Sequence, residues 1–248
     1  MSNLSYMQKA TDRGQLQIHV TTERGFFPIK DASIRLSYTG NPTEIIEELS
    51  TDISGQTAAV ELPAPPLEYS MEPSEFQPYS EYTIQVNASG YRPINISGIS
   101  VLPDKTSIQN VRMETATVDN PLERNIVITA NTLYGNFPPK IPEDEIKPMT
   151  ESGEIVLSRV VIPEYVIVHD GPPSDSSAND YYVRYRDYIK NVASSEIYAT
   201  WPDAALRANI LAIMSFTLNR VYTEWYRNKG YDFTITSSTA FDHKFVYG

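Results

Sequence analysis

The sequence predicts an α+β protein in two parts, an N-terminal antiparallel β-sandwich followed by a mixed domain that contains a helical hairpin. Three observations predict this. Short stretches alternate apolar and polar residues up to about residue 115, a segment rich in Pro and acidic residues follows, and beyond residue 180 apolar residues recur three and four positions apart. Hydrophobic residues make up 41% of the 248 residues, which is enough for packed cores.

The predicted sandwich spans residues 14–115, after an N-terminal arm at 1–13. Its stretches place every second apolar residue on one face, as strands require. Gly25, Gly55 and Gly90 lie between these stretches, in turns where a positive φ is needed. The apolar faces consist of Leu16, Ile18 and Val20, then Ala32, Ile34, Leu36 and Tyr38, then Tyr82, Ile84 and Val86.

The sequence motifs of this half resemble those of the transthyretin-like or carboxypeptidase-regulatory-like fold. The resemblance rests on "PIKDASIRL", "LSTDISGQTAAVELP" and "YTIQVNASGYRP" in that order. It implies a module that braces, adheres or regulates, and the residues offer no catalytic set here. Asp52 has two readings, a metal ligand or a solvated turn carboxylate, and its place in "TDISGQ" favours the turn.

Residues 116–153 are expected to form a connector and a possible processing segment. Prolines such as Pro138, Pro139, Pro142 and Pro148 remove backbone donors and disfavour helix, and such exposed segments are readily cut by proteases. Beyond it, residues 154–248 form the second predicted domain. It is expected to begin with two short strands around Pro163 and a polar loop at 171–180. The apolar residues of these strands are Ile155, Leu157, Val160 and Ile162, then Tyr165 and Ile167.

Two helices are predicted after this loop. The first, "YYVRYRDYIKNVASSEI", carries an apolar stripe that Glu196 extends. The second is expected to start at Pro202 and Asp203 and to end at Gly230. The stripe residues of the two helices are Tyr185, Tyr188, Ile189 and Val192, then Leu206, Ile210, Ile213, Thr217, Val221 and Glu224 or Trp225.

Glu196 is an acidic residue in line with the apolar stripe of the first predicted helix. A carboxyl group beside Tyr188, Tyr198 and Trp201 is expected to lose hydration, which favours its protonated form, and a general acid for a glycosidic bond must hold a proton. The alternative is an ordinary helix-end residue held by backbone donors or by Arg207. The spacing alone leaves both readings open.

The run "YRDYIKNVASSEIYATWPDAALRANILAIMSFTL", with "FVYG" at 245–248, resembles the catalytic domain of the stage II sporulation protein D family of peptidoglycan lytic transglycosylases. The family's Tyr, Glu, Trp-Pro and helix follow one another here as Tyr188, Glu196, Trp201-Pro202 and Ala205-Leu206. Asn209 replaces the family's usual Gln. The resemblance implies that Glu196 is the catalytic acid and that the domain, which relatives continue beyond residue 248, is incomplete.

The resemblance also implies a mechanism with one carboxyl group. Glu196 would protonate the oxygen between N-acetylmuramic acid and N-acetylglucosamine and then, as a base, form the 1,6-anhydro product. Tyr188, Trp201 and Tyr247 are expected to line the glycan groove, with plain core as the alternative. Glycan hydrogen bonds are expected from Ser237, Ser238 and Thr239, with a solvated loop as the alternative.

The whole chain resembles the spore cortex-lytic enzymes. That resemblance implies a propeptide in the first half, an activating germination protease, and synthesis in the mother cell for action at the spore. Two alternatives stay open, a non-catalytic wall-binding or spore-coat protein with a degenerate domain, and a β-sandwich component of a phage or secretion tail. The partners expected are peptidoglycan glycan strands.

The composition argues against several kinds of partner and site. The net charge of −11 disfavours nucleic acid as a partner, and the absence of Cys excludes disulfides, thiolate zinc sites and cysteine nucleophiles. With only His19, His169 and His243, we expect no metal and no cofactor. The N-terminus lacks a signal-peptide pattern, and no apolar run reaches the roughly 18 residues of a membrane span.

Overall fold

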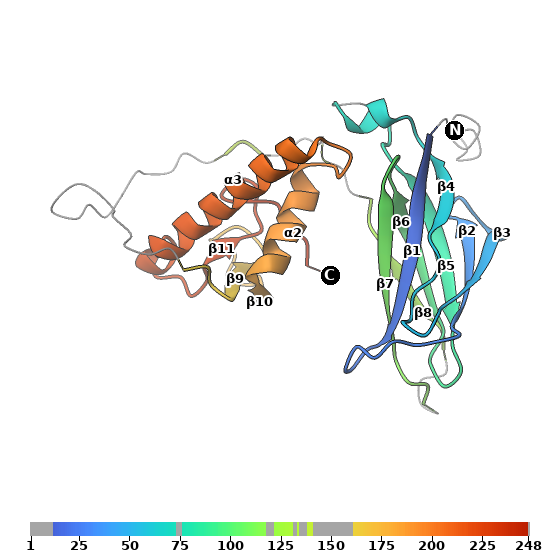
Figure 1. Ribbon diagram of the computed structural model, residues 1–248. Coiled ribbons are helices and arrows are strands. Elements are labelled where there is room, and N and C mark those ends of the chain that lie inside the picture. The colour runs from blue at the N-terminus through green and yellow to red at the C-terminus, as the bar shows by residue number, and fades with distance from the viewer. Residues whose placement is uncertain are drawn as a thin grey trace. The chain divides into compact units, whose positions relative to one another are not determined.

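The computed structural model describes residues 12–72, 76–117, 122–130, 133, 138–140 and 161–247. The chain divides into two compact units, Met1–Asn131 and Thr132–Gly248. Strands predominate in unit 1, and the two α-helices found among the described residues lie in unit 2 (Figure 1). The predicted α+β class is therefore confirmed.

Unit 1 contains two β-sheets that share one core (Figure 1). The three-stranded sheet has the order β4-β1-β7, and the five-stranded sheet has the order β3-β2-β5-β6-β8. The strands are β1 (Asp12–Thr22), β2 (Ser33–Tyr38), β3 (Asn41–Ser50), β4 (Val60–Ala64), β5 (Ser80–Asn87), β6 (Ile94–Val101), β7 (Thr106–Met113) and β8 (Arg124–Val127), with a 3₁₀ turn η1 at Leu67–Ser70.

The expectation of a wholly antiparallel sandwich is wrong at two pairings. β1 runs parallel to β7, and β6 runs parallel to β8. β8 also lies inside the segment predicted to be a connector. Four residues are too few for a clear alternation in the sequence, and β8 is held by its backbone hydrogen bonds to β6 more than by burial of its own side chains.

The alternating apolar residues of the sandwich point into its core, as predicted. The predicted faces of β1, β2 and β5 are fully buried except for Tyr38, which packs at the margin of the core. Full burial of one such side chain contributes about 1.5–3 kcal/mol. The fully buried residues among those predicted are Leu16, Ile18, Val20, Ala32, Ile34, Leu36, Tyr82, Ile84 and Val86.

Asp52 acts in a turn. Its Oδ1 accepts hydrogen bonds from the backbone N–H groups of Ser54 at 2.8 Å and Gln56 at 3.0 Å. Gly55, with φ of 72°, completes this turn, because a Cβ there would lie 2.5 Å from the carbonyl oxygen of Val20. These contacts favour the turn reading of Asp52 over the metal-ligand reading.

Gly98→Ala is expected to lower the free energy of unfolding of unit 1 by about 2–4 kcal/mol, against about 1 kcal/mol for Gly90→Ala. Both glycines have φ of 83°, but a Cβ at Gly98 would lie 2.4 Å from the Ile128 carbonyl oxygen, whereas one at Gly90 meets nothing within 4 Å. The difference between the variants therefore isolates the clash. Urea unfolding followed by far-UV circular dichroism measures it, and equal losses in the two variants would contradict the reason given.

Unit 2 packs two helices and a small sheet around a second core. The sheet has the order β10-β9-β11, with β10 antiparallel and β11 parallel to β9. Helix α2 contacts α3 and the strands β9 and β10 (Figure 1). The elements are β9 (Tyr165–His169), β10 (Asp180–Arg184), α2 (Tyr185–Glu196), α3 (Asp203–Tyr222), η2 (Arg227–Lys229) and β11 (Ile235–Thr236).

The structure corrects two predicted helix boundaries and the predicted faces of one strand in unit 2. The first helix begins at Tyr185, because the residues before it pair with β9 as strand β10. α3 ends at Tyr222, and Gly230, with φ of 86°, ends the short turn η2 instead. In β9 the buried apolar residues are Val166 and Val168, so the predicted strand had its faces reversed.

Only the end of the other predicted strand, before Pro163, lies within the described residues. Ile155, Leu157 and Val160 fall outside them, and Ile162 is not in a strand.

Candidate functional site

Glu196 is the last residue of α2, and its side chain is exposed. Its Oε2 accepts a hydrogen bond of 3.0 Å from Nδ2 of Asn209 on α3. The expected apolar surroundings are therefore wrong. The helix ends here, because Ile197 takes an extended conformation with φ of −147°, and the buried stripe of α2 stops at Ser195. The carboxylate faces solvent.

The corner after Glu196 joins α2 to α3. Tyr198 is buried, and its carbonyl oxygen accepts a hydrogen bond of 3.1 Å from the Trp201 backbone N–H. Trp201 is half-buried, and Pro202, with φ of −55°, precedes the first turn of α3. The tight turn thus keeps Trp201 on the same corner as Glu196. Its predicted contact with a glycan stays a prediction.

Tyr188 cannot contact a glycan in this structure, because its side chain is fully buried. Burial, followed by the nearby charges of Asp242 and Glu196, raises the pKa of Tyr188 well above its usual value. Its hydroxyl lies 3.3 Å from Nδ1 of His243, and its ring stacks on Phe245. Of the two readings of Tyr188, plain core and glycan groove, the structure supports core.

Tyr247 lies on the surface and is 58% exposed. Its ring stacks face to face on Tyr181, with 3.6 Å between the ring centroids and 6° between the planes. Asn191 of α2 fixes the backbone beside it, donating from Nδ2 to the Val246 carbonyl oxygen and accepting on Oδ1 from the Val246 N–H. An exposed aromatic ring on a fixed segment suits sugar stacking, so the predicted role of Tyr247 is compatible with its position.

Ser237 and Ser238 are half-buried, in the turn that follows β11. The Ser237 N–H donates to the His169 carbonyl oxygen at 2.8 Å, and the Ser238 carbonyl oxygen accepts from the N–H groups of Phe241 and Asp242. Their backbones therefore shape the turn that leads to Asp242. Glycan contacts by their hydroxyls, and by Thr239, stay predictions.

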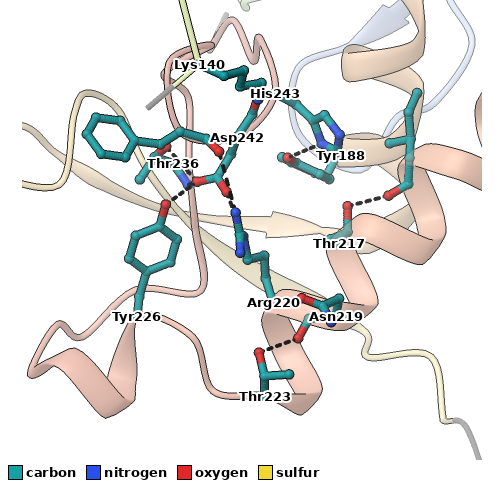
Figure 2. A network of polar contacts seen from close by, with 12 residues as sticks. Lys140, Tyr188, Thr217, Asn219, Arg220, Thr223, Tyr226, Thr236, Asp242 and His243 are labelled. Atoms are coloured by element: carbon teal, nitrogen blue, oxygen red, sulfur yellow. Dashed lines mark hydrogen bonds and ion pairs between the residues drawn. The ribbon is translucent and has the colours of Figure 1, made fainter. Parts of the chain in front are cut away.

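A buried polar network centred on Asp242 holds unit 2 together (Figure 2). The Arg220 Nε donates to Oδ1 at 2.8 Å, and Oδ2 accepts from the Tyr226 hydroxyl at 2.6 Å and from both N–H and Oγ1 of Thr236 at 2.9 and 2.7 Å. The side chains of Arg220 and Asp242 are 2% and 0% exposed. Lys140 donates to the Asp242 carbonyl oxygen. Burial, with the charge of Asp242, raises the pKa of Tyr226.

Sequence reasoning missed this network. Thr236, Tyr226 and Arg220 lie 6, 16 and 22 residues from Asp242, and no short motif links them. A signal was present in α3, where Arg220 continues the buried face of Ile213 and Thr217 at spacings of four and three. A charged residue on such a face requires a buried counter-ion.

His243 lies next to this network, and burial lowers its pKa to about 4. Unfolding returns the imidazole to its usual pKa near 6.5, so between pH 6.5 and 4 the unfolded chain binds the extra proton. Above pH 6.5 the protonation of His243 therefore costs unit 2 no stability, and below pH 6.5 the free energy of unfolding falls as the pH drops. We expect unit 2 to lose about 2–3 kcal/mol between pH 7 and pH 4 from this residue.

Tryptophan fluorescence measures this loss selectively, because Trp201 and Trp225 are the only tryptophans and both lie in unit 2. The His243→Gln variant keeps a polar group near Tyr188 and removes the titration. Its unfolding free energy should depend less on pH over this range. An unchanged pH dependence would assign the acid sensitivity to other groups.

His169 has a structural partner. Its Nδ1 lies 2.7 Å from Oδ1 of Asp180, and its ring stacks on Phe233. The contact links β9 to β10. Within the described part of the chain, no group of three or more His, Cys, Asp or Glu residues is arranged to hold a metal ion. No helix in that part is long and apolar enough to cross a membrane.

An apolar pocket of about 550 Å³ opens between α2 and α3. Arg186 and Lys190 are its charged members, and it contains none of the predicted site residues. The other lining residues are Ile162, Tyr185, Ile189, Ala193, Ile210 and Met214. The pocket lacks carboxyl groups and so offers no acid chemistry of its own.

No family model matches the chain, and no curated protein is significantly similar to it. Among solved structures, the TIE protein of Bacillus anthracis is 17% identical with a TM-score of 0.29, over 42% of this chain and 17% of that one. The minor pilin GBS52 of Streptococcus agalactiae is 13% identical with a TM-score of 0.30, over 43% and 46%. The 5-hydroxyisourate hydrolase of Klebsiella pneumoniae is 15% identical with a TM-score of 0.28, over 42% and 92%. Similarities this low assign no function.

Proposed function

We propose that this protein is a precursor of a peptidoglycan lytic transglycosylase that acts on spore cortex, with Glu196 as general acid and base. One observation carries the proposal. The exposed carboxylate of Glu196 ends α2, accepts a hydrogen bond from Asn209, and precedes a Trp-Pro corner and the helix α3. This order is that of the stage II sporulation protein D family, which the sequence resembles.

The reaction proceeds in two proton transfers. Glu196 donates its proton to the glycosidic oxygen as the bond from the muramoyl C1 to that oxygen breaks, which releases N-acetylglucosamine with a free 4-hydroxyl. The carboxylate then takes the proton of the muramoyl 6-hydroxyl while O6 bonds to C1. The product is a 1,6-anhydro sugar, the carboxyl group is protonated again, and no water is consumed.

A neighbouring acid is unsuited to act as a second catalytic carboxylate. Asp242, whose charge acts on Tyr188 as that of Glu196 does, is fully buried and is engaged by Arg220, Tyr226 and Thr236. Hydrolysing glycosidases use two acids, one on each side of the bond. Asp242 is therefore not available as a second catalytic carboxylate, and the proposed mechanism uses Glu196 alone.

The glycan contacts proposed are Trp201, Ser237, Ser238 and Tyr247. The exposure of Tyr247 supports its role most directly. Unit 1 is proposed as a regulatory propeptide, which a germination protease removes after synthesis in the mother cell. Its sandwich supplies no catalytic set, in keeping with a bracing role.

Mass spectrometry of the soluble products from decoated spore cortex tests the proposal. The chain is expected to release 1,6-anhydro-muropeptides. Products with free reducing ends would instead indicate a hydrolase. Sedimentation with insoluble peptidoglycan without soluble product would favour the alternative, a wall-binding or spore-coat protein with a degenerate domain.

A further inference from the structure

Asn209 is the side chain that contacts the proposed catalytic carboxylate. It lies on the second turn of α3, 13 residues beyond Glu196, and its Nδ2 is 3.0 Å from Oε2. An exposed Glu at a helix end samples many rotamers, and a hydrogen bond from the adjacent helix restricts them. The contact therefore fixes one oxygen and leaves Oε1 available to a substrate.

The Asn209 side chain has features that lower the stability of the folded chain. Its Oδ1 is buried and has no hydrogen-bond partner among the residues that the structure describes. Turning the amide over would place Oδ1 against the carboxylate, two acceptors together, so the observed orientation is the favourable one. An unpaired buried acceptor and a helix-interior Asn both disfavour folding. Residues that lower stability in this way are typical of functional sites.

We infer that Asn209 is a positioning residue for Glu196. Its amide holds the carboxylate in place and donates a hydrogen bond to the charge that Glu196 carries between the two proton transfers. The inference rests on the proposed function, since it assigns Asn209 a part in that reaction. A hydrogen bond to a carboxylate favours the charged form. The charge of Glu196 also acts on Tyr188, whose hydroxyl is buried.

The test compares Asn209→Ala, Asn209→Asp and Asn209→Gln in the full chain, with Asn219→Ala as the control. Asn219 is an exposed asparagine on the same helix. In Asn209→Ala we expect kcat for anhydro-muropeptide release to fall about 10- to 100-fold, with KM nearly unchanged and the unfolding midpoint equal or higher. Asn209→Gln, which keeps the amide, should recover part of the rate, and Asn219→Ala should retain all of it.

A second readout does not depend on activity. The carboxyl carbon of Glu196, followed by NMR and assigned with Glu196→Gln, reports the contact directly. Its chemical shift at a fixed neutral pH is expected to change in Asn209→Ala and Asn209→Asp, which remove the Nδ2–H donor, and to stay at its native value in Asn219→Ala.

The outcomes separate the inference from the proposed function. A rate loss that parallels a loss of stability, or a Glu196 carboxyl chemical shift that is the same in every variant, would overturn the positioning role. If the native chain releases no anhydro product while that chemical shift still responds to Asn209, the proposed reaction fails and the contact between the two residues stands.

Discussion

Glu196→Gln is expected to release anhydro-muropeptides from decoated spore cortex about 10²- to 10⁴-fold more slowly than the native chain. Glutamine keeps the size of the side chain and an oxygen that Asn209 can bind, but it cannot give or take the proton. Because Glu196 is exposed at the end of α2, the fold should be unaffected. Mass spectrometry of the soluble products gives the rate, and tryptophan fluorescence gives the stability of unit 2.

Asp187→Asn is the matched control for this loss. Asp187 is also an exposed acid on α2, and its ion pair with Arg186, at 3.8 Å, is open to solvent. The control removes the same charge from the same helix and should leave the rate within about twofold, since exposed ion pairs contribute little. Undiminished release by Glu196→Gln would show that another group supplies the proton.

The sandwich of unit 1 was predictable because its side chains alternate. Leu16, Ile18 and Val20 face inward and their neighbours face outward, so the sequence itself records the burial of the strand. The parallel partners of β1 and β6 were not predictable, because strand direction depends on which distant segments meet. Nothing in the composition of β7 or β8 records that choice.

The helical hairpin was predictable in kind but not in its ends. Apolar spacing identified α2 and α3, yet Tyr182 and Arg184 belong to a strand. Periodicity over five residues does not separate a strand that leads into a helix from the first turn of that helix. Strand β10 is set by its pairing with β9, which is a tertiary contact.

Only the part of the candidate site that is local in the sequence could be predicted. The order of Glu196, Trp201 and Pro202 is local and can be read from the sequence. The exposure of Glu196 and the burial of Tyr188 depend on where α2 stops, which spacing does not give. Asn209 was noted only as a departure from a family pattern, and its contact with Glu196 appears once the two helices are folded together.

Asp242→Asn is expected to lower the unfolding free energy of unit 2 by about 3–5 kcal/mol. The substitution removes the carboxylate charge from beside the buried guanidinium of Arg220 and replaces one of the acceptor oxygens by an NH₂ group. Tryptophan fluorescence during urea unfolding measures the loss. Asp187→Asn serves here too, as an exposed acid whose removal should change the stability by less than about 1 kcal/mol.

Arg220→Met, alone and combined with Asp242→Asn, completes a double-mutant cycle that measures the interaction between Arg220 and Asp242. Alone, it leaves the Asp242 carboxylate buried, and the donors to it that remain among the described residues, Tyr226 and Thr236, are neutral. The double variant should lose less stability than the sum of the two single variants, because neither charge then stays buried without the other. Hydrogen exchange adds a local readout, since the Thr236 N–H donates to Asp242. Additive losses, with the Thr236 amide still protected in Asp242→Asn, would show that the Arg220–Asp242 pair does not hold β11 to α3.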